Sequence, residues 1–100
     1  MLITLIVLNE KSLDKLSEFS KETLSKGHEL IIFLYSQGVK LIKKKKIKHL
    51  AKFEGIRLLA CQTSLREYGL DPSNYLDSEM SSLSELVELL EQSDRVIFVR

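Results

Sequence analysis

Four short apolar runs recur along the chain, separated by polar segments with helical spacing. They are LITLIVL from residue 2, ELIIFLY from residue 29, IRLLA from residue 56 and RVIFV from residue 95. Runs that are apolar at nearly every position, with Ile and Val prominent, are typical of strands buried on both faces of a parallel sheet. The pattern therefore predicts strands over residues 2–8, 29–35, 56–60 and 95–99.

The polar segments between these runs predict helices. One spans about residues 12–26, and Gly27 follows it at a position where a left-handed residue commonly ends a helix. A short helix over residues 63–68 is closed by Gly69. Residues 83–90 carry apolar side chains at i, i+3, i+4 and i+7, and Ser82 with Glu85 forms a capping box before them.

The remaining segments predict connections. Residues 36–39 read as a loop in which Gly38 supplies backbone freedom. Residues 40–53 fit either a helix or an irregular crossover, and Pro72 with Asn74 marks a further loop. Strands that alternate with helices predict one α/β domain over residues 1–100, with three layers and right-handed crossovers. We expect a mostly parallel sheet of four to five strands with helices on both faces, flavodoxin-like in outline.

Composition supports a single domain with a real core. The chain has 100 residues, 44% of them apolar, and lacks the run of about 18 apolar residues that spans a membrane. The apolar N-terminus has neither a basic flank nor a small-residue cleavage site, so we expect a first strand rather than a signal peptide. A single cysteine cannot form an internal disulfide, which favours a reducing, cytoplasmic location.

Charge is distributed unevenly, although the formal net charge is only +1. Residues 40–57 hold eight basic side chains and one acid, whereas residues 71–94 hold seven acids and no base. This asymmetry predicts a basic face and an acidic face, which could be complementary between subunits.

The only cysteine, Cys61, lies where the third strand ends and a helix begins. Ligands and reactive groups collect at this end of parallel strands, next to the predicted loops at 9–12, 36–40 and 61–64. Unpaired N–H groups and the helix dipole favour a thiolate there, and Gln62, Thr63 and Ser64 could hydrogen-bond an anion. The alternative is an inert packing residue, because free cysteine is among the most buried residue types.

Other thiol chemistries fit the sequence poorly. A phosphatase loop needs five residues between cysteine and arginine, and Arg66 is one residue too close. Position 64 is serine, so there is no Cys-x-x-Cys redox pair. We expect His28 and His49 to be ordinary surface residues, and with Cys61 they form no metal-ligand spacing.

The chain resembles the DsrE/DsrF-like sulfur-relay family, which includes the TusD-type carriers. The resemblance covers nearly the whole chain, and its matching points are Gly27-His28, Gly38-Val39, Cys61 and Gly69-Leu70. Two departures are the short loop after the first strand and the absence of a second cysteine.

The resemblance implies a protein that carries sulfane sulfur as a persulfide on Cys61 and passes it to a partner thiol. It also implies persulfide donor and acceptor proteins as partners, and assembly as a homo-oligomer (trimer or hexamer) or a hetero-oligomer. Gln62, Thr63 and Ser64 would stabilise the persulfide anion. Thiol exchange needs no acid, base, metal or other cofactor, so we expect none. The alternative is a catalytically silent structural or regulatory subunit of a DsrE-type oligomer.

A third function class, a nucleotide-binding or signalling module, is disfavoured. Asn9-Glu10-Lys11 follows the first strand in place of a glycine-rich phosphate loop, and it offers too few acids for a receiver domain.

A lysine cluster in the crossover is a candidate docking surface. Its members are Lys40, Lys43, Lys44, Lys45, Lys46 and Lys48. No aromatic residues are interleaved with them for base stacking, so direct RNA contact is possible but not favoured. A solvated face is the favoured interpretation, and docking on the acidic surface of another subunit is an alternative.

Overall fold

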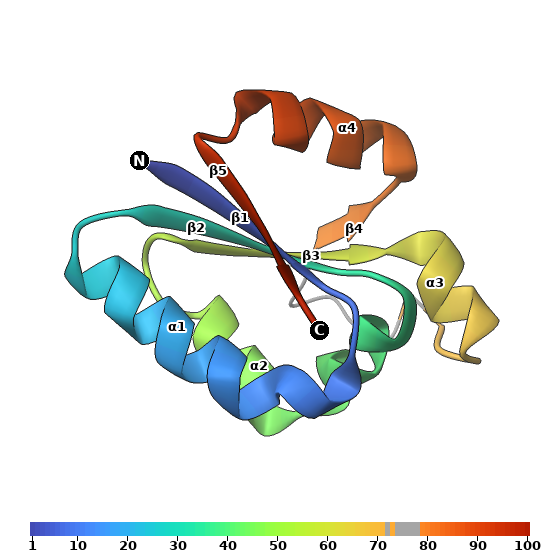
Figure 1. The fold of residues 1–100 in the computed structure, drawn as a ribbon. Helices are drawn as coiled ribbons and strands as arrows, with labels where there is room; N and C mark the ends of the chain where they lie inside the picture. The colour runs from blue at the N-terminus through green and yellow to red at the C-terminus, as the bar shows by residue number, and fades with distance from the viewer. Residues whose placement is uncertain (72, 74–78) are drawn as a thin grey trace.

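The computed structural model describes residues 1–71, 73 and 79–100, which form a five-stranded parallel sheet in the order β4-β3-β2-β1-β5. Every strand pair is parallel. The elements, drawn in Figure 1, are β1 (Leu2–Val7), η1 (Glu10–Ser12), α1 (Leu13–Ser25), β2 (Glu29–Leu34), η2 (Ser36–Lys43), α2 (Lys45–Ala51), β3 (Ile56–Cys61), α3 (Gln62–Glu67), β4 (Glu79–Ser81), α4 (Leu83–Gln92) and β5 (Arg95–Val99). The predicted three-layer α/β fold is confirmed.

The central strand is β1, which pairs with β2 on one side and β5 on the other. Its side chains from Ile3 to Val7 are all buried, as the continuous apolar run predicts. The four predicted strands are confirmed to within one residue at each end. The edge strand β4 was not predicted, because its three residues, EMS, carry no apolar pattern.

The two faces of the sheet are covered unequally (Figure 1). Among the described residues, α1, α2 and α3 lie on one face and α4 is the only helix on the other. The larger core cluster fills the first face and includes Leu5, Leu34, Ile47 and Leu65. The smaller cluster lies under α4; its buried members are Ile31, Phe33, Leu59, Cys61 and Leu89. The second face therefore depends on a single helix for its cover.

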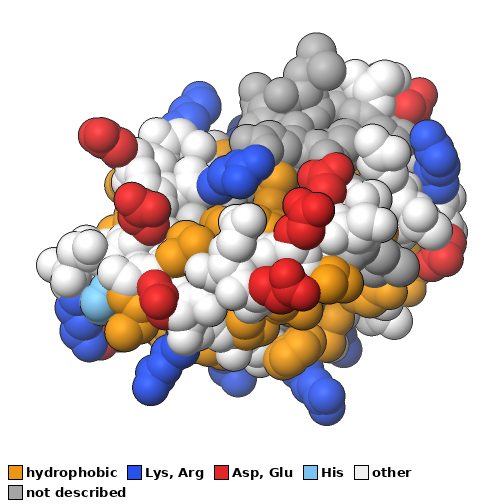
Figure 2. Space-filling model, turned by 90° about the horizontal axis from the view of Figure 1, so that it is seen from above, with side chains coloured by type: hydrophobic (Ala, Val, Ile, Leu, Met, Phe, Trp, Pro, Cys, Tyr) orange, Lys and Arg blue, Asp and Glu red, His pale blue; other side chains and the backbone are white. Residues whose placement is uncertain are grey.

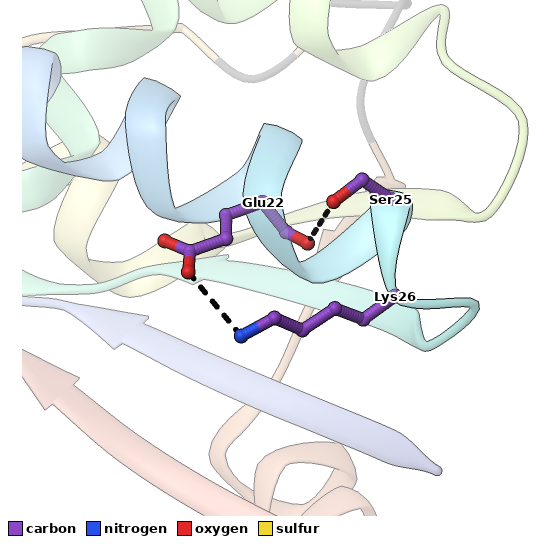
Figure 3. A network of polar contacts seen from close by, with 3 residues as sticks. All are labelled: Glu22, Ser25 and Lys26. Atoms are coloured by element: carbon purple, nitrogen blue, oxygen red, sulfur yellow. Dashed lines mark hydrogen bonds and ion pairs between the residues drawn. The ribbon is translucent and has the colours of Figure 1, made fainter.

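The end of α1 follows the prediction. Gly27 adopts φ +82°, the left-handed conformation that glycine tolerates. The last turn before it is held by side chains, as Figure 3 shows. Ser25 Oγ donates to the Glu22 carbonyl oxygen at 2.6 Å, and Lys26 Nζ lies 3.2 Å from Glu22 Oε1.

The segment after β2 is more regular than the sequence indicated. Residues 36–39, predicted as a loop, belong to the 3₁₀ helix η2, and the ambiguous crossover continues as η2 followed by α2. Apolar side chains at Val39, Ile42 and Ile47 are buried. Lys44 separates the two helices, because its extended conformation interrupts the helical turn. Burying these residues against the sheet gives the segment its helical form.

The start and the end of α4 are both fixed by side chains. Ser82 Oγ accepts a hydrogen bond from the Glu85 amide at 3.3 Å, as expected of a capping residue. At the other end Ser93 Oγ donates to the Leu89 carbonyl oxygen at 2.6 Å and also contacts Thr4 Oγ1 in the centre of β1. This contact ties the helix to the middle of the sheet. The loop predicted at Pro72 and Asn74 lies outside the described residues.

Gly38 is required because a side chain would not fit at this position. The sequence interpretation, which assigned it a role in backbone freedom, was wrong. The φ of Gly38 does not lie in the left-handed region, unlike that of Gly27. A Cβ atom at Gly38 would overlap the carbonyl oxygen of Val7, so η2 packs backbone against backbone on the end of β1.

We predict that Gly38→Ala lowers the free energy of unfolding by about 3 kcal/mol, because η2 must move away from β1 to admit the methyl group. Gly27→Ala is the matched control. It meets no atom within 4 Å and should cost only about 1–2 kcal/mol, from left-handed strain. Urea unfolding of both variants measures the difference; equal losses would contradict the close approach.

Candidate functional site

Three segments meet at the carboxyl edge of the sheet, where the sequence analysis expected loops. They are the short helices η1, η2 and α3, which follow β1, β2 and β3, and side-chain contacts join them. Lys40 Nζ of η2 lies 3.7 Å from Glu10 Oε1 of η1 and 4.9 Å from the centre of the Tyr68 ring. Ser36 at the start of η2 contacts Ser64 of α3. The edge is therefore a connected surface and not three separate loops.

Cys61 is the last residue of β3 and directly precedes α3, where the sequence placed it. Its side chain is not displayed to solvent, however: only 1% of the residue is exposed. It lies in the smaller core cluster with Phe33, Leu59 and Leu89, and Tyr35 packs against that cluster. Cys61 has the packing environment of a small apolar residue.

The three residues after Cys61 fall into two groups. Gln62 and Thr63 are exposed, whereas Ser64 is 4% exposed. Ser64 Oγ accepts a hydrogen bond from the Ser36 amide at 3.0 Å. Ser36 has φ +54°, an uncommon conformation for a residue with a side chain. Ser64 therefore holds the turn after β2, and its hydroxyl is already engaged there.

The histidines do not approach the cysteine. His28 is half-buried before β2, at the opposite edge of the sheet from Cys61. His49 is exposed on α2, where its ring meets Phe53 edge-on at 5.3 Å. α2 and the cluster that holds Cys61 lie on different faces of the sheet. The fold thus supplies no Cys–His pair.

The lysine cluster does not form one site: Lys43 and Lys44 are exposed, and the other members fall into two groups. Lys40 belongs to the carboxyl edge, in contact with Glu10 and Tyr68. Members from α2 line a cavity of about 590 Å³ between α1 and α2; its lining residues are Ser17, Lys21, Lys45, Lys46, Lys48, His49, Leu50 and Lys52. We call this cavity the basic groove. Lys21 was not predicted to join this group, because it comes from a different helix, α1.

One lysine of the basic groove is paired. Lys46 Nζ lies 2.9 Å from Asp14 Oδ1 of α1, and this hydrogen bond and charge lower the pKa of Asp14. The remaining lining lysines have no ion pair within the described residues.

Acidic side chains lie on the other face of the molecule. Glu85, Glu88 and Glu91 are exposed on α4, and Figure 2 shows a group of acids on this face. Because α2 and α4 cover opposite faces of the sheet, the basic groove cannot meet these acids within one subunit.

The described part of the chain contains no group of three or more His, Cys, Asp or Glu side chains that could hold a metal ion. None of its helices is both long and apolar enough to cross a membrane.

We predict that Ser64→Ala lowers the free energy of unfolding by about 1–2 kcal/mol, because the Ser36 amide loses its acceptor in a half-buried turn. Thr63→Ala, an exposed neighbour on the same helix, should change stability by less than about 0.5 kcal/mol. Thermal unfolding of the two variants checks this, and an unchanged Ser64→Ala protein would mean that the turn does not depend on the hydroxyl.

Comparison with known proteins relates the whole chain to one family. The family model of the DsrE/DsrF-like family matches residues 1–99. The ychN protein from E. coli has 18% identity and a TM-score of 0.76, with coverage of 98% of this chain and 99% of that one. MTH1491 from Methanobacterium thermoautotrophicum, described as a protein of unknown function, has 19% identity and a TM-score of 0.72, with coverage of 97% and 96%. No curated protein matches. The two structures share the fold, and the family match shows that the chain belongs to the DsrE/DsrF-like family.

Proposed function

We propose that this chain serves sulfur relay as a structural or regulatory subunit of a DsrE-type oligomer, in which Cys61 is a packing residue. Family membership supports the sulfur-relay context. The observation that carries the role of Cys61 is its burial: 1% of the residue is exposed. Persulfide donor and acceptor proteins would then engage other subunits of the assembly.

Burial opposes each step of sulfur transfer at Cys61. The nucleophile is the thiolate, and an anion surrounded by Phe33, Leu59 and Leu89 lacks the solvation that stabilises it. A donor persulfide must also bring its outer sulfur into contact with Sγ. A loaded persulfide adds one more sulfur atom to a cluster in which Phe33 is fully buried, and overpacking of this kind destabilises a core.

A second candidate is the sulfur carrier itself, and one observation favours it. Cys61 lies at the end of β3, beside the exposed Gln62 and Thr63. If α4 moved away from the sheet, the thiol would become accessible at the carboxyl edge. In this form the Cys61 thiolate attacks the outer sulfur of a donor persulfide. The donor S–S bond breaks, the donor leaves as a thiolate, and Cys61 becomes the persulfide.

Thiol reactivity separates the two candidates. We predict that native protein reacts with a disulfide reagent at neutral pH far more slowly than unfolded protein does, because the reagent reaches Sγ only after the cover opens. A small persulfide donor should add no sulfur to the intact mass. Fast native reaction, with one added sulfur that Cys61→Ala abolishes, would establish the carrier form instead.

Stability gives an independent measure of the environment of Cys61. We predict that Cys61→Ala lowers the free energy of unfolding by about 1 kcal/mol through lost packing. Cys61→Ser should lower it by about 2 kcal/mol, because the hydroxyl would be buried among apolar side chains. Gln62→Ala is an exposed control and should have little effect. A serine variant as stable as wild type would show that the position is solvated.

A further inference from the structure

The outer edge of β5 has the features of a strand that is open to pairing. β5 ends the sheet, with β1 on one side and no described strand on the other. Four of its five residues, RVIFV, are apolar. It contains no lysine or proline, the residues that commonly protect an exposed edge. The opposite edge strand, β4, is only three residues long.

The backbone of β5 offers hydrogen-bonding groups along this edge. The Leu8 amide donates to the Val99 carbonyl oxygen at 2.9 Å, so residue 99 faces β1. Because successive residues of a strand alternate in direction, Arg95 and Ile97 also face β1, and the amides of Val96 and Phe98 point away from it. The carbonyl oxygens of an added strand could accept hydrogen bonds from these amides.

Apolar side chains are exposed on both faces of the same strand. Phe98 is 59% exposed on the face that α4 covers only in part. On the other face Ile97 and Val99 are half-buried and line a hollow of about 300 Å³ together with Leu16 and Phe19 of α1. Figure 2 shows apolar side chains reaching the surface beside the acids of the α4 face.

We propose that the β5 edge is the docking surface for a second copy of this chain, paired antiparallel about a two-fold axis through Ile97. This register places Asp94 opposite Arg100 of the second copy at both ends of the strand. It also places Phe98 opposite Val96, so each exposed ring packs on an apolar side chain of the partner strand. The two sheets would then form one continuous sheet.

Charge selects this register over its neighbours. The smallest shift that keeps the ladder hydrogen bonds is two residues, because residues alternate in direction along a strand. Such a shift places Asp94 opposite Phe98 in one direction and Arg100 opposite Val96 in the other, and neither register has a charge pair. One oxygen of Asp94 already accepts from the Leu2 amide at 2.7 Å, which holds the carboxylate in place.

The inference rests on the oligomeric part of the proposed function and is independent of Cys61. Its first test is a cross-link in the full-length chain. Because the backbone polar groups of Ile97 face β1, the two Ile97 residues at the axis form a pair without mutual hydrogen bonds, with Cα atoms about 4.5 Å apart, within the usual disulfide range. Ile97→Cys should therefore form a covalent dimer with oxidised glutathione, which takes up the two electrons and the protons of the two thiols.

Val99→Cys is the matched control, because residue 99 faces Arg95 across the axis and the two copies of residue 99 lie far apart. We expect no cross-link from Val99→Cys or from wild type. Reduction should return the Ile97→Cys dimer to single chains. Equal cross-linking of the two variants would reflect random collision and would overturn the register.

The second test is the mass in solution by light scattering. Phe98→Lys should weaken the dimer by at least about tenfold in dissociation constant. Val87→Lys, at a similarly exposed apolar residue of α4, should leave it unchanged. A wild-type chain that is monomeric at high concentration would overturn this inference but not the proposed function, because the subunits that carry sulfur in that proposal are different chains. An oligomer that persists in Phe98→Lys, without the Ile97→Cys cross-link, would overturn the β5 edge alone.

Discussion

The fold depends on the pairing of one fully buried strand, β1, with parallel partners on both sides. Parallel strands cannot be joined by tight turns, so each connection must cross a face of the sheet as a helix. The same constraint gathers the ends of β1, β2 and β3 at one edge, where η1, η2 and α3 begin. The position of Cys61 at that edge follows from the topology, whatever its chemistry.

Burial of Cys61 follows from a second property, the alternation of side chains along β3. Residues 59 and 61 point to the same face, and that face is covered by α4 through Leu86 and Leu89. A cysteine one residue earlier would point into the larger core, where Ala60 lies. The thiol thus lies at the carboxyl edge of the sheet but beneath α4. Its position in the strand favours the carrier function, whereas its burial favours the structural one.

Periodicity in the sequence was enough to predict the strands and the main helices, because continuous apolar runs and helical stripes report burial directly. It did not predict β4, whose three residues carry no pattern, or the role of Gly38, which depends on the Val7 carbonyl in another element. The sequence pattern also did not predict that Ser36 contacts Ser64 or that Lys21 lines the basic groove. Each joins residues distant in sequence, and no local propensity encodes such a contact. For Cys61, strand alternation could be read from the sequence, but the path of α4 over that face could not.

Lysines around α2 and glutamates on α4 lie on opposite faces of the sheet, so charge is separated across it although the formal net charge is only +1. The electric field of an approaching charged partner rotates a protein with separated charges, even when its net charge attracts the partner only weakly. The effect acts within a Debye length of about 8 Å at physiological ionic strength. Partners of either sign would therefore meet opposite faces of this protein, with its orientation selected before contact.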